Sequence, residues 1–156
     1  MNALDNPAYF HILINHVPLI GLFFGLIALS VALFLKSRPA QTTALILILI
    51  AALSSIPTDR SGGNAYKMVR GFSDEAGADW LDIHADRADQ AMPAFYVLAI
   101  LTVAALIAPY KWEKGEMPLL GLVFVAAIVS LVLVTYVAQA GGKIRHPEFR
   151  QIEMFK

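Results

Sequence analysis

The sequence of 156 residues contains no cysteine. This absence excludes disulfides, thiolate zinc sites, cysteine-ligated iron–sulfur clusters and covalently attached c-type haem. Charge is also scarce, because charged residues make up 15% of the chain against about 25% in typical soluble domains. Twelve basic residues balance twelve acidic ones, so no net charge draws the chain to nucleic acid. No hydrolase, kinase or P-loop signature is present.

Apolar residues, by contrast, make up 58% of the chain. They gather in four runs that lack lysine, arginine and acids, at 10–35, 40–57, 91–110 and 117–142. A helix of about 20 apolar residues crosses a hydrocarbon core of about 30 Å. We therefore predict an all-α fold, a four-helix transmembrane bundle in a single domain over 1–156, with spans at about 10–36, 41–56, 91–109 and 117–141. No segment alternates with the period of a strand.

A long polar segment, 58–90, separates the second and third spans. Its residues 61–64, SGGN, predict a flexible turn. Ser73, followed by two acids, is typical of a capped helix start. We expect an amphipathic helix to begin there and to lead into span three, covering about 74–109 with a bend near Pro93. With an even number of spans, both termini and this segment lie on one side of the membrane. No internal repeat is evident.

Four histidines fall on this same side: His11 and His16 at the start of span one, His84 before span three, and His146 after span four. Neutral imidazole is a common ligand of haem iron and transition metals, and an ionisable group within a span is a functional candidate. His11 and His16 are about 140° apart around an ideal helix, so both face one ligand only if His11 precedes the helix. We therefore predict His16 with His84 as one axial pair and His11 with His146 as a second.

Other charged residues on this side fit two kinds of site. Arg60, Arg87 and Arg145 are suited to haem propionates or lipid phosphates, because a guanidinium group pairs bidentately with oxyanions. Asp82 or Asp86 could instead complete a non-haem copper, zinc or iron site with the same histidines. These two alternatives stay open at the level of the sequence.

One stretch, 11–19 with the sequence HILINHVPL, resembles the H-P-x-x-V-H-F-P start of a family of small four-span bacterial membrane proteins, the domain of unknown function 2231 family. The chain is also similar to that family in His84 at the head of span three, and in Gly141 and Gly142 followed by His146. The family has no settled activity. The resemblance therefore implies the four-span architecture and the histidine cluster, and no function.

Our leading hypothesis is a b-type cytochrome-like protein that holds haem b through these histidines and transfers electrons at one membrane face. Such a protein is an electron carrier or accessory subunit, with a redox partner or larger complex, rather than a stand-alone enzyme. The alternatives are a non-haem copper, zinc or iron protein and a cofactor-free structural subunit. Gly21 and Gly25 form a GxxxG pair that could join copies of the chain in the lipid bilayer.

The location follows from the flanks of the first span. The resemblance to a family of bacterial membrane proteins implies the bacterial inner membrane as the location. Lys36 and Arg38 follow the first span and no basic residue precedes it. Because basic residues concentrate in cytoplasmic loops, we expect the histidine-rich side to face the periplasm.

Overall fold

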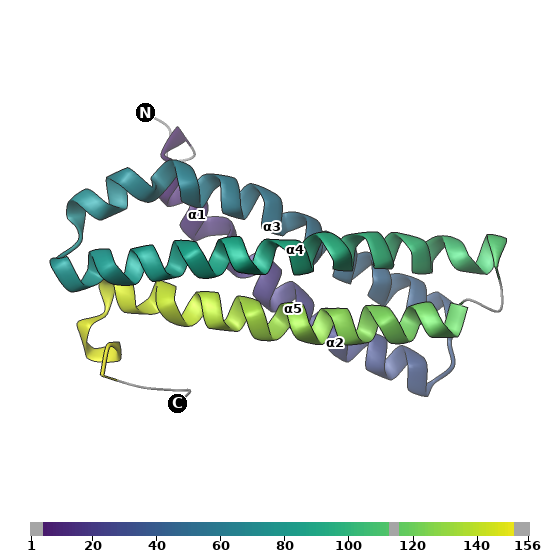
Figure 1. Ribbon diagram of the computed structural model, residues 1–156. Helices are drawn as coiled ribbons and strands as arrows, with labels where there is room; N and C mark the ends of the chain where they lie inside the picture. The colour runs from purple at the N-terminus through teal and green to yellow at the C-terminus, as the bar shows by residue number, and fades with distance from the viewer. Residues whose placement is uncertain (1–4, 113–115, 152–156) are drawn as a thin grey trace.

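The computed structural model describes residues 5–112 and 116–151 of the chain (Figure 1). Its elements follow in the order α1 (Pro7–Ile14), α2 (His16–Phe34), α3 (Arg38–Phe72), α4 (Glu75–Lys111), α5 (Glu116–Arg145) and the short 3₁₀ helix η3 (Pro147–Phe149). No strand occurs within these two described ranges. The all-α prediction is confirmed.

Four stretches are long and apolar enough to cross a membrane: α1 with α2, α3, α4 and α5. Many of their large apolar side chains point outward, and Phe24, Ile100 and Val132 are 59%, 69% and 63% exposed. Exposing such apolar surface to water is unfavourable, whereas lipid accommodates it. In lipid the backbone N–H and C=O groups must form their hydrogen bonds within the protein, as they do in a helix. The chain is therefore an integral membrane protein whose four helical spans contact the bilayer.

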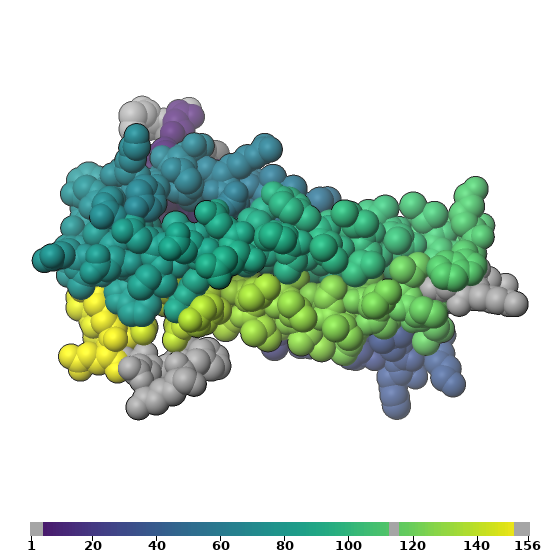
Figure 2. Space-filling model, viewed as in Figure 1, coloured from purple at the N-terminus to yellow at the C-terminus, as the bar shows by residue number. Residues whose placement is uncertain are grey.

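The helices form an elongated bundle. α4 packs against α3 and α5, α2 packs against α3 and α5, and α1 packs against α3. Figure 2 shows α4 and α5 side by side along the length of the molecule. One end of the bundle carries α1, the turn between α3 and α4, and η3 (Figure 1). We call it the histidine end.

Two glycines allow α2 and α3 to approach each other closely. A Cβ atom at Gly21 would lie 2.8 Å from the Ala51 Cβ, and one at Gly25 would lie 2.8 Å from the Ile48 Cγ1. The GxxxG pair therefore packs within one chain, against α3. The Gly21/Gly25 face, which we expected to join two copies of the chain, is thus covered by a helix of the same chain.

The expected flexible turn at 61–64 is also wrong, because α3 continues through it to Phe72. None of the described glycines has a positive φ, so Gly62 and Gly63 are ordinary helical residues here. The helix is held at its start by Ser37, whose hydroxyl accepts a hydrogen bond from the Ala40 N–H. The second span thus belongs to a helix that extends well beyond the predicted end at residue 56.

Two helix starts also differ from the sequence prediction. The first span is interrupted at Asn15, where α1 ends and α2 begins. The N-cap of α4 is Asp74 rather than Ser73, and its carboxylate accepts a hydrogen bond from the Gly77 N–H at 2.9 Å. α4 then runs unbroken through Pro93 to Lys111.

Candidate functional site

The side chains of His11 and His84 meet at the histidine end of the bundle. His11 comes from α1 and His84 from α4, and both rings are partly buried. The rings stand edge to face, with their centroids 6.3 Å apart and their planes at 83°. The structure therefore brings together two histidines that are far apart in the sequence.

The His11 ring is oriented by α3. Its Nδ1 lies 2.9 Å from the backbone oxygen of Thr58 and 3.2 Å from the Ser61 Oγ. A carbonyl oxygen can only accept, so Nδ1 carries the proton and Nε2 has its lone pair free. The ring also lies directly over Gly62, where a Cβ atom would be 3.0 Å from the His11 Cε1. Any larger residue at position 62 would push the ring away.

The His84 ring is oriented by α5 in the same way. Its Nδ1 donates to the backbone oxygen of Val137 at 2.9 Å, which again leaves Nε2 as the free nitrogen. The ring lies over Gly141, where a Cβ atom would be 3.1 Å from both the Cε1 and the Nδ1 of His84. Among the residues that the structure describes, neither Nε2 atom has a hydrogen-bond partner.

The two histidines thus occupy equivalent positions. In each case the ring donates to a carbonyl four residues before the glycine that it covers, Thr58 before Gly62 and Val137 before Gly141. The ring and its acceptor are 47 residues apart in the first case and 53 in the second. The sequence prediction missed this relationship. The only signal for it is that a Gly-Gly pair follows each of these histidines at a similar distance.

The other two histidines lie elsewhere. His16 begins α2 and its side chain is exposed, so it is not the histidine that the structure places beside His84. His146 is exposed after α5, where its Nδ1 lies 2.9 Å from the Glu148 carboxylate and its ring stacks on Phe149. Its described contacts are therefore with its own sequence neighbours.

The three predicted arginines differ in their surroundings. Arg87 lies one helical turn after His84, donates to the Tyr136 backbone oxygen at 2.9 Å, and stacks on the Tyr136 ring at 3.3 Å. These contacts hold the guanidinium group without neutralising its charge. Arg60 and Arg145 are exposed, on α3 and at the end of α5.

The two carboxylates of the non-haem alternative differ in their surroundings. Asp82 accepts hydrogen bonds from the Tyr66 hydroxyl and from Arg70 on α3. Asp86 is exposed. Within residues 5–112 and 116–151, no group of three or more histidine, aspartate or glutamate side chains is arranged to hold a metal ion.

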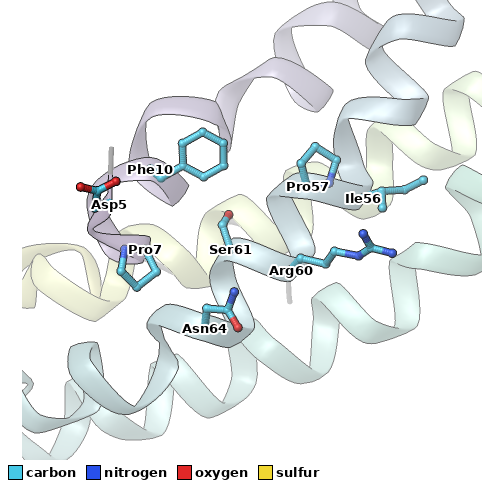
Figure 3. Close-up of a pocket in the computed structure, with 8 residues that line it drawn as sticks. All are labelled: Asp5, Pro7, Phe10, Ile56, Pro57, Arg60, Ser61 and Asn64. Carbon is cyan, nitrogen blue, oxygen red and sulfur yellow. The ribbon is translucent and has the colours of Figure 1, made fainter. Parts of the chain in front are cut away.

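A pocket of about 360 Å³ opens beside the His11 site, between α1 and α3. Figure 3 shows residues of α1 on one side of it and residues of α3 on the other. Ser61 belongs both to the wall of this pocket and to the hydrogen bonds of the His11 ring. The Ser61 side chain therefore lies between the pocket and the His11 ring.

We compared the chain with protein-family models, with curated proteins and with solved structures, and none of the three comparisons finds a match.

Proposed function

We propose that this protein is a b-type cytochrome-like electron carrier that holds haem b through His11 and His84. The observation that carries the proposal is the paired geometry of the two rings. Each Nδ1–H is bound to a backbone carbonyl, and each Nε2 has its lone pair free. This is the usual arrangement of a metal-ligating histidine, because the outer hydrogen bond selects the tautomer and orients the ring.

The two rings lie close enough together to be candidates for one iron atom, which they would hold through their Nε2 atoms. The centroids of His11 and His84 are 6.3 Å apart. The two residues also come from different helices, as axial ligands in a helical bundle do.

The surrounding residues have separate roles in this proposal. Bound haem would supply one-electron redox chemistry, with a potential set by its ligands and its burial. The carbonyls of Thr58 and Val137 make both imidazoles more electron-rich through the Nδ1–H bonds. Arg87 and Arg60, whose charges meet no carboxylate within hydrogen-bond distance among the described residues, are the candidates for the haem propionates. The exposed Arg145 has no comparable support.

Two alternatives are weaker. A non-haem copper, zinc or iron site needs three or more ligands in most proteins, and Asp82 is already engaged with Tyr66 and Arg70. A purely structural subunit would not need two neighbouring histidines with free Nε2 atoms. The proposal also places the protein in the bacterial inner membrane, with its histidine end facing the periplasm and with a redox partner. It keeps the resemblance to the domain of unknown function 2231 family.

The test is an absorption spectrum of the purified protein after expression with ample haem, oxidised and then reduced with dithionite. We expect Soret and α bands in the wild type, and we expect His11→Ala and His84→Ala to lose them while keeping their helical content. His16→Ala and His146→Ala are the matched controls and should keep the bands. If the bands survive in His11→Ala and disappear in His16→Ala, His16 and His84 are the axial pair instead. A wild type without the bands refutes haem binding.

A further inference from the structure

Apolar side chains line both sides of the pocket between α1 and α3. Pro7 and Phe10 contribute from α1, and Ile56 and Pro57 contribute from α3 (Figure 3). Proline and phenylalanine rings present rigid faces with little conformational entropy to lose on binding. These side chains are suited to a planar apolar ring.

The rest of the wall is polar. Arg60 and Asn64 supply N–H donors, Ser61 supplies a hydroxyl, and Asp5 supplies a carboxylate. A phosphate prefers clustered positive charge, and Arg60 is a single cation in this lining. The donors therefore favour an uncharged ligand that accepts hydrogen bonds.

We infer that this pocket binds the head group of a membrane quinone. The quinone ring would lie against the apolar side chains, and a carbonyl oxygen would accept a hydrogen bond from the Asn64 side-chain amide. The pocket lies at the start of α1, where an apolar span begins, so an isoprenoid tail can continue into the bilayer. The volume of about 360 Å³ is in the range of small-molecule sites, about 300–1,000 Å³.

Ser61 links this pocket to the His11 ring. Its hydroxyl donates to the Thr58 backbone oxygen at 2.8 Å, and its oxygen lies 3.2 Å from the His11 Nδ1. The hydroxyl proton is thus already used, so Ser61 connects the two sites rather than binding the ligand tightly. The choice of a quinone, among neutral rings with carbonyl groups, rests on the proposed electron-transfer function.

The experiment is titration of the detergent-solubilised full chain with decylubiquinone in a calorimeter. We expect saturable binding of one quinone per chain. Asn64→Trp fills the pocket and should weaken binding by about tenfold or more. Phe23→Trp is the matched control, because Phe23 is exposed and lines a separate apolar groove between α2 and α5. It should change the affinity by less than about twofold.

Three results would overturn the inference: no saturable binding, equal binding by wild type and Asn64→Trp, or displacement of bound quinone by lysophosphatidylglycerol at lower concentration than by a second quinone. The last would identify a lipid site. The His84→Ala protein separates this inference from the haem proposal, because His84 does not line the pocket. It should bind decylubiquinone normally even though it lacks haem. If the wild type shows haem bands but does not bind quinone, the quinone inference is wrong and the haem proposal stands.

Discussion

His11 and His84 are held by the same pair of contacts, a helix carbonyl and a glycine, on two different helices. Each Nδ1–H donates at 2.9 Å to a helix carbonyl, and each ring lies over the glycine one turn beyond that carbonyl. A helix carbonyl can accept from a side chain in addition to its helical N–H, and the Thr58 oxygen shares its second lone pair between His11 and the Ser61 hydroxyl. The glycine removes the Cβ atom that would otherwise block the ring.

This arrangement predicts the effect of two glycine substitutions. Gly62→Ala and Gly141→Ala each add a Cβ atom 3.0–3.1 Å from a histidine ring. The ring must then move, which weakens its hydrogen bond and shifts its Nε2 atom. We expect haem affinity to fall roughly 10–100-fold, as it does when outer-shell partners of a metal ligand are lost. Haem titration followed at the Soret band measures this change.

The chain supplies matched controls at the neighbouring positions. A Cβ atom at Gly63 or Gly142 would meet nothing within 4 Å. Gly63→Ala and Gly142→Ala should therefore leave haem affinity unchanged and stabilise their helices by up to about 1 kcal/mol, the propensity difference between alanine and glycine. Equal loss of haem in all four variants would show that the rings do not depend on these close contacts.

A second prediction concerns the contact between α2 and α3. Gly21→Ala places a Cβ atom 2.8 Å from the Ala51 Cβ, which is too short to be relieved by a side-chain rotation. We expect a loss of about 1–3 kcal/mol in the free energy of unfolding, typical of overpacking. Thermal unfolding in detergent measures it, and Gly121→Ala, whose Cβ would meet nothing within 4 Å, is the control.

The same variant tests the role of the glycine pair in assembly. Because Gly21 faces α3 of its own chain, Gly21→Ala should leave the sedimentation behaviour of the protein unchanged. A shift from a larger species to monomer, without loss of stability, would restore the GxxxG pair as an interface between copies.

A third prediction is a pH dependence outside the membrane. Arg150 donates to both carboxylate oxygens of Asp74, at 2.7 and 2.8 Å. The hydrogen bonds from Arg150, followed by that from the Gly77 N–H, hold the pKa of Asp74 below its usual range. A lowered carboxylate pKa stabilises the folded state above the unfolded pKa, and this contribution is lost as the pH falls through the folded pKa.

The measurable result is release of the segment around η3 in acid. A spin label near η3 should become more mobile as the pH falls below the usual aspartate range, and Asp74→Asn should show this mobility already at neutral pH. Asp79→Asn, which removes a different exposed carboxylate of α4, should behave like the wild type. Equal mobility in all three proteins at every pH would show that the Asp74–Arg150 pair does not hold this segment.

The spans could be predicted because the absence of charge from long runs is a property of the sequence alone, and the four apolar helices confirm it. The histidine pairing could not be predicted in this way. It depends on the interruption of the first span at Asn15, which gives His11 its own helix against α3. The turn predicted at residues 61–64 is wrong for a related reason. Glycine allows a turn, but it equally allows a ring to pack closely against a helix, and the sequence does not show that the His11 ring packs here.

The last prediction concerns orientation in the membrane. Lys36 and Arg38 follow the first span at the end of the bundle opposite the histidine end (Figure 1), and basic residues near the first span tend to stay in the cytoplasm. We therefore expect the histidine end to face the periplasm. The cysteine-free chain allows a direct test with single cysteines at two exposed lysines, Lys67→Cys on α3 at the histidine end and Lys111→Cys at the opposite end of α4. In intact cells, a membrane-impermeant maleimide should label Lys67→Cys and reach Lys111→Cys only after permeabilisation. The reverse pattern would place the histidine end in the cytoplasm, where any redox partner would then have to be sought.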